Sequence, residues 1–406
     1  MIAKQLLPAL AAIGSVAAKS ATTCTVSTTT INSQADATGL ASCSAVKGSV
    51  LIAPGAGPQI DISGPSTISG DVILLNNGII TSLTSSNLGT IGGEFHLQNV
   101  TLLSTLSFMG LGRVGSIVWQ SLPALGQLTF GTPGVTEANN VTISDTFLSS
   151  LDGIDLTHVS SMDINNNRRL TDFTTQLGNV SSLLNIAANG LQLKVSMPNL
   201  IWITEMSIAN VTSFSVPSLA VVNGSARFDF NYFSSFNAPN LTTAKTEDIS
   251  FVGNPNLANI TMPELTSIGG GLLIANNTAL SKVNGFPALK TVGGAVKLRG
   301  NFTDIEFPAL NDVKGAFDIS STADISSSCN TFQKLAPSSQ GGGGQIQGTY
   351  SCTSNNANAN SDTGTGTSGS GSGGSSSGSN NTAAGLTINH ALLGLAAVGG
   401  FAQALW

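Results

Sequence analysis

A short sequence pattern recurs about every 22 residues along most of this chain. In each copy, two apolar residues separated by one residue are followed closely by Asn, Ser, Asp or Gly, as in VILLNN at Val72 or VKLRGN at Val296. The second apolar residue falls at thirteen positions spaced 21 to 24 residues apart: Ile52, Leu74, Leu97, Trp119, Ile143, Ile164, Ile186, Ile208, Phe230, Phe251, Ile274, Leu298 and Ile319. A spacing this regular indicates a repeat architecture.

The alternation of apolar residues predicts a short strand with one buried face in every repeat. A unit of this length cannot bury its own apolar face, so neighbouring units must stack into a continuous parallel sheet over one long core. With a strand spacing of ~4.8 Å, thirteen turns give a rod roughly 60 Å long. The sequence therefore predicts a mainly β fold, a single parallel solenoid of about 13 turns.

The corners of the turns are marked by Pro, Gly and Asn. Proline in P-x-L-x-x-h segments, as at Pro263 and Pro287, suits a corner because it cannot donate to a central ladder. Glycine pairs such as Gly293–Gly294 suit a tight bend. Asparagines that follow the strands are predicted to turn inward and to hydrogen-bond the corner backbone: Asn76, Asn166, Asn189, Asn254 and Asn277.

The four cysteines lie in two pairs at the two ends of the repeats. In an oxidising compartment an even count suggests disulfides, and Cys24–Cys43 and Cys329–Cys352 are the natural pairs if the ends lie far apart. Both disulfides sit where the solenoid needs capping, and SSCNTFQKLA from Ser326 is a candidate covering helix. There is no C-x-x-C motif, and no metal or cofactor is predicted.

Both termini carry features of a secreted and anchored protein. Residues 1–18 have a Lys, an apolar run and small residues, the layout of a signal peptide; the alternatives are a short buried helix or a membrane anchor. The small residues GSNNTA, a polar spacer and a terminal apolar run indicate a GPI-anchor signal, with the docked C-terminal helix as the alternative. Asn381 is the preferred attachment residue, with Ser379 and Asn380 left open.

The chain is thus expected to divide into four parts. A signal peptide, 1–18, precedes a β-solenoid, 19–352. The segment 353–381 consists almost entirely of Ser, Gly, Asn and Thr, which cannot bury a core, so it is interpreted as a flexible, O-glycosylatable stalk. Residues 382–406 form a GPI propeptide that is removed.

Ten N-x-S/T sequons are plausible glycan acceptors behind a signal peptide. The five predicted to be N-glycosylated are Asn140, Asn179, Asn223, Asn240 and Asn259. Three others, Asn99, Asn210 and Asn276, fall at positions that alternation places inward, where no glycan fits.

Charge argues against a nucleic-acid partner. Only 9% of the residues are charged, and the net charge is −6 with 15 Lys plus Arg in 406 residues. A weakly acidic chain has no basic patch of the kind that binds nucleic acid.

Taken in order, these features resemble a known family. The signal peptide, the P-x-L turns, the cysteines at both ends, the C-N-x-F-x-x-L cap from Cys329, the Ser/Gly stalk and the GPI tail are similar to those of fungal GPI-anchored cell-wall organisation proteins. The resemblance implies a receptor L-domain, a leucine-rich-repeat-like right-handed β-helix. It also implies a non-enzymatic glycoprotein of the plasma membrane and cell wall, needed for wall integrity, with no catalytic residues to carry over.

A wall polysaccharide-modifying enzyme is the alternative, because parallel β-helices also cleave polysaccharides. Such an enzyme needs paired carboxylates on an outward face. Asp163 and Asp229 lie three turns apart, roughly 14 Å, which exceeds the ~9.5 Å limit for paired glycosidase carboxylates. Glu94 and His96 share a face but no nucleophile joins them.

The outward strand positions instead carry mostly amides and hydroxyls, which predicts a docking surface for wall glucan or a wall glycoprotein; an ordinary solvated face is the alternative. Trp202, Tyr232 and Phe233 near turn edges are candidates for stacking on a sugar ring. The outward residues are His96, Gln98, Gln120, Thr142, Ser144, Asp163, Asn165, Asn185, Ser207, Asp229, Asn231, Ser250, Lys297, Arg299, Asp318 and Ser320.

Overall fold

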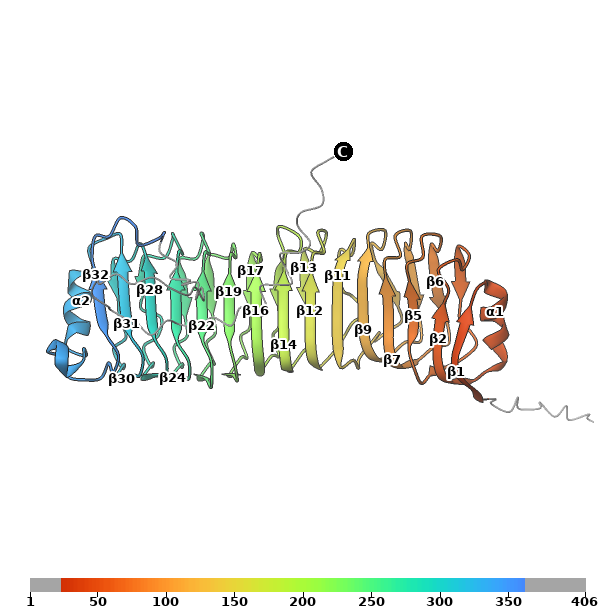
Figure 1. Cartoon of the computed structure of the whole chain (residues 1–406), viewed down its shortest axis with the longest axis horizontal. Coiled ribbons are helices and arrows are strands. Elements are labelled where there is room, and N and C mark those ends of the chain that lie inside the picture. The colour runs from red at the N-terminus through yellow and green to blue at the C-terminus, as the bar shows by residue number, and fades with distance from the viewer. Residues whose placement is uncertain (1–22, 362–406) are drawn as a thin grey trace, which may run out of the picture.

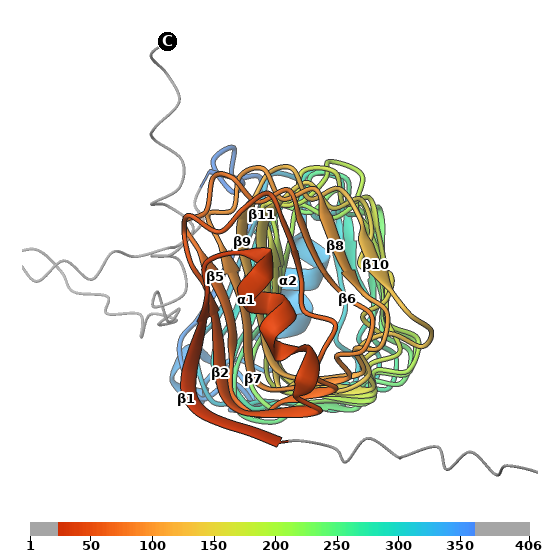
Figure 2. The ribbon, with the colours of Figure 1, turned by 90° about the vertical axis from the view of Figure 1, so that its right-hand side faces the viewer.

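The structure, a computed structural model, describes residues 23–361, which form one elongated β-solenoid of about 14 turns. Figure 1 shows the strands standing side by side along the rod, with a short helix at each end. Viewed along the rod, successive turns superpose around a shared interior (Figure 2). The predicted fold class is confirmed.

One large parallel sheet runs the whole length of the rod. Its strands are β1 (Thr23–Ile31), β2 (Ala45–Ile52), β4 (Thr67–Ile68), β5 (Val72–Leu75), β7 (Thr90–Gln98), β9 (Arg113–Leu122), β11 (Asn140–Thr146), β12 (His158–Asn165), β14 (Asn179–Ala187), β16 (Trp202–Ala209), β18 (Val221–Val222), β19 (Ala226–Asp229), β21 (Thr243–Ala244), β22 (Ile249–Val252), β24 (Ser267–Ile268), β25 (Leu272–Ala275), β27 (Thr291–Val292), β28 (Val296–Gly300), β30 (Asp312–Val313), β31 (Phe317–Ser321) and β32 (Tyr350–Thr353).

Shorter strands form four small parallel sheets on a second side of the solenoid. They are β3 (Gln59–Asp61), β6 (Ser82–Ser85), β8 (Thr105–Phe108) and β10 (Leu128–Phe130); then β13 (Asp172–Thr174), β15 (Lys194–Ser196) and β17 (Ser213–Ser215); then β20 (Ser235–Asn237) with β23 (Asn259–Thr261), and β26 (Lys282–Val283) with β29 (Asp304–Ile305). The helices are α1 (Gln34–Gly39) and α2 (Ser326–Gln333), with 3₁₀ turns at Leu40–Ser42 and Ser338–Gln340.

Inward residues of the large sheet stack in register, as the repeat spacing predicts. Ile143 pairs with Ile164, then Ile186, then Ile208, and all four are buried. Twelve of the thirteen predicted inward residues are buried in this way. The strands β1 and β32, which lack the repeat pattern, extend the sheet at its two ends.

The prediction for Phe230 is wrong. Phe228 pairs with Ile208 and Phe251 and is 1% exposed, whereas Phe230 is 61% exposed. Phe228 stacks on Phe251 at 4.7 Å between ring centroids and contacts Phe236 at 4.5 Å. The two phenylalanines have the same parity, so alternation alone cannot choose between them; the strand ends at Asp229, and the chain bends before Phe230.

A bend with positive φ follows the strand in most turns. The residues that adopt it, with φ between 52° and 68°, are Asn76, Asn99, Ser121, Asp145, Asn166, Ala188, Asn210, Phe230, Gly253 and Asn276. We call these ten residues the corner positions. The left-handed conformation disfavours residues with a Cβ atom and is tolerated best by Gly and Asn, which explains the abundance of Asn here.

The residue after the corner position turns inward and forms an asparagine ladder. Its members, all buried, are Asn77, Asn167, Asn189, Asn231, Asn254 and Asn277. Asn254 shows the pattern: its Nδ2 donates to the Phe228 carbonyl at 2.9 Å, and its Oδ1 accepts the Asn231 N–H at 2.7 Å. Each amide thus satisfies corner backbone groups of the preceding turn.

The predicted ladder was right at Asn189, Asn254 and Asn277. It was wrong at Asn76 and Asn166, which are exposed corner positions; the residue after each lies in the ladder instead. It also missed Asn231, which was expected to face outward and is a buried member of the ladder. In all three cases the positive φ shifts the alternation by one residue.

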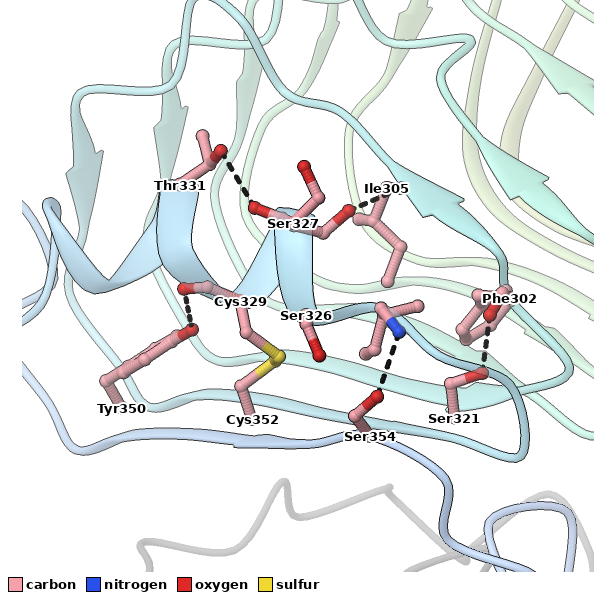
Figure 3. The surroundings of a disulfide bond; sticks show 12 residues. Phe302, Ile305, Ser321, Ser326, Ser327, Cys329, Thr331, Tyr350, Cys352 and Ser354 are labelled. Atoms are coloured by element: carbon pink, nitrogen blue, oxygen red, sulfur yellow. Dashed lines mark hydrogen bonds between the residues drawn. A yellow bond between two sulfur atoms is a disulfide. The ribbon is translucent and has the colours of Figure 1, made fainter.

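The ends of the rod are closed by helices and disulfides. Disulfides join Cys24 to Cys43 and Cys329 to Cys352, the two pairs expected from the sequence. Figure 3 shows α2 lying beside the last strand, tied by the second disulfide and by a 2.7 Å hydrogen bond from the Tyr350 hydroxyl to the Cys329 carbonyl.

A glutamine side chain caps an outermost strand edge at each end. At one end Gln34 bonds Asp61 of β3 through both amide atoms: Oε1 accepts the N–H at 2.7 Å and Nε2 donates to the carbonyl at 3.2 Å. At the other end Gln340 makes the same pair of bonds with Tyr350 of β32, at 2.8 and 3.1 Å. Each side chain therefore imitates the backbone of one more strand.

The chain stays against the solenoid after the last disulfide. The Asn356 N–H donates to the Ser321 carbonyl at 2.8 Å, and its Nδ2 donates to the Ser320 Oγ at 2.9 Å. Asn360 donates to Asn301, and Ala359 is fully buried. The beginning of the predicted stalk thus contacts the outside of the last turns.

Several predictions fall outside the described residues: the signal peptide, the remaining stalk, the removed propeptide and Asn381. In the described range 23–361, no helix combines the length and apolar character needed to cross a membrane.

Candidate functional site

The outward side of the large sheet offers a continuous surface along the rod, because this sheet runs through nearly every turn. Its side chains alternate with the buried core residues, and the parallel register places one from each turn above the next. One such row runs from His96 through Val118, Thr142, Asp163, Asn185 and Ser207 to Arg227. We call this surface the outer face.

Amide and hydroxyl groups on β11, β12 and β14 are joined into one network. Asp163 Oδ1 accepts hydrogen bonds from Asn165 Nδ2 and Asn185 Nδ2, each at 2.8 Å. Asn165 Oδ1 accepts from the Ser144 hydroxyl at 2.6 Å and from Asn166 Nδ2 at 2.8 Å. These donors fix the amide groups in one arrangement, which suits recognition of a ligand rich in hydroxyl groups.

The other carboxylates of the outer face are paired with arginines. Arg227 Nη2 lies 3.3 Å from Asp229 Oδ2 on β19. Burial raises the pKa of the Asp229 carboxyl, and the Arg227 charge opposes this effect. Arg299 binds Asp318 through both guanidinium nitrogens, Nη1 at 3.1 Å from Oδ1 and Nη2 in contact with Oδ2.

At the N-terminal end, His96 Nδ1 lies 3.5 Å from Glu94 Oε2, so the pair expected from the sequence does form. Asp71 Oδ1 accepts the Glu94 N–H at 2.8 Å, and no Ser hydroxyl or Cys thiol is bonded to His96 among the described residues. The pair therefore has no nucleophile beside it in this part of the chain.

Most residues predicted to face outward do so, with four that are buried. Asn231 belongs to the asparagine ladder, and Ser320 is covered by Asn356. Ser250 and Arg299 lie on the outer face but are only 7% and 8% exposed. The accessible part of the face therefore lies mainly between β7 and β19.

The three aromatic residues predicted to stack on a sugar ring differ in their exposure. Tyr232 is 43% exposed, Trp202 is partly buried, and Phe233 is 2% exposed and belongs to the core. Phe230, assigned to the core from the sequence, is instead the most exposed aromatic residue in the described chain. The sequence feature that could have revealed this exposure is a phenylalanine at a repeat position where most other turns carry Asn or another small residue.

The sequons lie on strands and corners of the surface. Asn140, Asn240 and Asn259 are exposed, and Asn179 and Asn223 are partly exposed. The inward placement of Asn99, Asn210 and Asn276 was wrong, because all three are corner positions that point away from the core; Asn99 is exposed and the other two are partly exposed.

Comparison with known proteins gives relatives over most of the chain. A family model described as GPI-anchored cell wall organization protein, Ecm33, matches residues 1–41. Protein ecm33 of Aspergillus fumigatus is 40% identical over 86% of this chain and 85% of its own length. A cell surface GPI-anchored protein of Arthroderma benhamiae is 35% identical over 83% and 85%, and cell wall protein ecm33 of Schizosaccharomyces pombe is 28% identical over 75% and 72%. No solved structure matches the chain.

Proposed function

Because this chain belongs to the Ecm33 family of GPI-anchored cell wall organisation proteins, we propose that it organises the fungal wall by binding wall polymers along its outer face. In this proposal the protein sits on the outer leaflet of the plasma membrane and in the wall, held by a GPI lipid. It acts through its surface and catalyses no reaction.

The observation that carries the proposal is the fixed polar network on β11, β12 and β14. A polysaccharide offers many hydroxyl groups and little charge, so it is bound best by preoriented amides and hydroxyls. Ser144, Asn165 and Asn185 provide such groups. The Ser144–Asn165 bond and the bonds of both asparagines to Asp163 remove much of the entropy cost of ordering them.

Repetition adds to the strength of the surface. A polymer lying along the rod meets one outward side chain of the row every ~4.8 Å, so weak contacts add up over several turns. The strands are held in fixed register, and the ligand need not reorganise the protein.

The GPI lipid would tether this rod to the membrane. Asn381 is the proposed attachment residue, and the segment from 362 to 381 would connect it to the folded part. The anchor is tested by treating membranes from expressing cells with phosphatidylinositol-specific phospholipase C. A GPI-anchored protein should be released into the soluble fraction.

A wall-modifying enzyme remains the alternative function. Against it, the outer-face carboxylates Asp163, Asp229 and Asp318 are each held by amide or guanidinium donors. Asp163 and Asp229 are three strands apart in the register, roughly 14 Å, which is too far for a glycosidase pair.

The two functions are separated by incubating the full chain, purified in detergent, with β-glucan, chitin and mannan. Retention on a polymer without release of shorter sugars supports the proposal. Cleavage of any polymer supports the enzyme. Failure to bind any of the three polymers contradicts the proposal.

A matched pair of variants locates the binding surface. The double variant Asn165→Ala/Asn185→Ala breaks the network and is expected to weaken retention several-fold. The control Thr174→Ala/Ser215→Ala removes polar groups from β13 and β17 on the second side and should bind like the original protein. Deletion of the gene should also sensitise cells to wall-stressing dyes.

A further inference from the structure

We propose that Phe230 and Tyr232 form a stacking platform for one sugar ring of a neutral wall polysaccharide, at the edge of the outer face. This inference rests on the proposed function and assigns it a specific site. The platform consists of the two exposed rings on either side of the buried Asn231, and it directly follows the Arg227–Asp229 pair along the chain.

Phe230 adopts a backbone conformation that its residue type disfavours. It has φ 55° at a corner position, where the other nine turns carry Asn, Gly, Ser, Asp or Ala. A bulky residue with positive φ is a true outlier, and such strain persists where the surrounding structure enforces it. The fold itself would be served better by Asn or Gly here, so the ring has a purpose other than stability.

The ring is also exposed to an extent that folding does not explain. Phe230 is 61% exposed and Tyr232 43%, although the core of the same turns contains five phenylalanines whose rings contact one another. Leaving a large apolar side chain in water forfeits the free energy that its burial would provide. Two such side chains two residues apart indicate an apolar contact that forms only with a ligand.

The neighbouring turn holds the Phe230 ring in place. A Cβ atom added to Gly253 would lie 2.7 Å from both Cδ1 and Cε1 of Phe230, so only glycine leaves room for this edge of the ring. The backbone is fixed as well, since the Phe230 N–H donates to the Val252 carbonyl at 2.9 Å. The Phe230 part of the platform is therefore largely in place before a ligand arrives, which lowers the cost of binding.

The polar groups beside the rings complete a site for a sugar. Sugar rings present apolar C–H faces and a rim of hydroxyls, and an aromatic face with adjacent donors and acceptors matches both. Arg227 and Asp229 supply a donor and an acceptor whose charges cancel, so the site favours a neutral polymer over a charged one.

Other exposed apolar residues lack these features. The Phe147 ring is covered by the Arg169 guanidinium, which lies 4.5 Å from the ring centroid. Leu191 is 83% exposed but is aliphatic, two turns away along the register. Leu191 therefore offers a control for exposed apolar area without a ring.

The test uses the full chain, purified in detergent and freed of N-glycans, because Asn210 is a sequon whose side chain contacts the Phe230 carbonyl at 3.5 Å. Retention on β-glucan, chitin and mannan is compared for the original protein, Phe230→Asn, Phe230→Trp and Leu191→Asn. Thermal unfolding of each variant is recorded alongside.

Phe230→Asn is expected to lower affinity for the bound polymer about tenfold, while its Tm stays equal or rises by about 1 °C, because Asn accepts the corner conformation. Phe230→Trp and Leu191→Asn should stay within about twofold of the original affinity. Loss of binding without loss of stability separates a ligand contact from a structural role.

Equal retention of Phe230→Asn and the original protein would overturn the inference while leaving the proposed function standing; this is the outcome expected if the rings serve a protein partner. Failure of the original protein to bind any of the three polymers would refute the proposed function and the platform with it. A loss that Leu191→Asn shares would also overturn the assignment of the site to Phe230.

Discussion

At the residue scale, one backbone feature decides which side chains face the core. Strand alternation predicts the residue two places after each strand centre to lie inside, yet positive φ at the corner positions turns that residue outward and the next one inward. Where Asn occurs twice or three times in a row, as at Asn165–Asn167, the sequence shows that an amide is needed but not which one. The errors at Asn76, Asn166 and Phe230 share this cause.

The asparagine ladder predicts very different effects for two adjacent residues. Asn167 Nδ2 donates to the Ile143 carbonyl at 2.9 Å, and its Oδ1 accepts from the Thr146 N–H at 3.1 Å. Asn167→Ala leaves these buried groups unpaired and should lower the free energy of unfolding by about 2–4 kcal/mol. Asn166→Gly should change it by less than about 0.5 kcal/mol, since Gly adopts positive φ freely.

Urea denaturation followed by circular dichroism measures both changes. Equal losses in the two variants would mean that the amide at Asn166 carries as much of the corner as the one at Asn167, against the ladder described here.

At the element scale, the strands and corners of the repeats could be predicted because each carries its own period and its own Pro, Gly or Asn. The terminal strands β1 and β32 could not be predicted from the sequence, because they lack the apolar pair of the repeat. They become strands only by pairing with β2 and β31. The outward set was mostly predictable from alternation. The bonds that link Asp163 to Asn165 and Asn185 depend on register between turns, which periodicity gives only to within a residue.

The glutamine caps should prevent the rods from joining end to end. Gln34→Ala and Gln340→Ala each expose unpaired backbone groups of a terminal strand, which are templates for pairing with another chain. Sedimentation velocity is expected to show association that increases with protein concentration in both variants. The control Gln176→Ala, on the side of the rod, should sediment like the original protein. Sedimentation like the original protein in all three variants would argue against a capping role.

The C-terminal cap should respond to alkaline pH through Tyr350. Burial raises the pKa of its hydroxyl to about 12, against about 10 in the unfolded chain. The neutral form is therefore favoured by folding, so this contribution to stability is complete below pH ~10 and is lost as the pH rises toward 12. The advantage of the original protein over Tyr350→Phe should shrink across this range.

The urea midpoints of both proteins at a pH just below 10 and at a pH near 12 provide the measurement. Taking the difference between the two proteins cancels the titration of lysines. A difference that does not change with pH would show that Tyr350 ionises equally easily in the folded and unfolded chains.

At the scale of the whole molecule, the fold converts a repeat of about 22 residues into a rod with a broad polar face. The interior is uniform, so the differences between turns lie on the surface and at the corners. Phe230 stands out in this setting, because nine turns place a small or polar residue where one turn places an exposed ring. The fold can be predicted from the spacing alone, whereas this site emerges only when the corner geometry is known.

The central claim is that equivalent residues of successive turns lie one strand spacing apart. It is tested most directly by spin labels on introduced cysteines, since all four native cysteines are in disulfides. Thr142 and Lys297 are seven steps apart in the register, and His96 and Lys297 are nine.

Double electron–electron resonance should give narrow distance distributions centred near ~34 Å for Thr142→Cys/Lys297→Cys and ~43 Å for His96→Cys/Lys297→Cys. The difference of ~10 Å corresponds to the two additional turns. Broad distributions, or distances that do not increase with the number of intervening turns, would contradict the stacked solenoid.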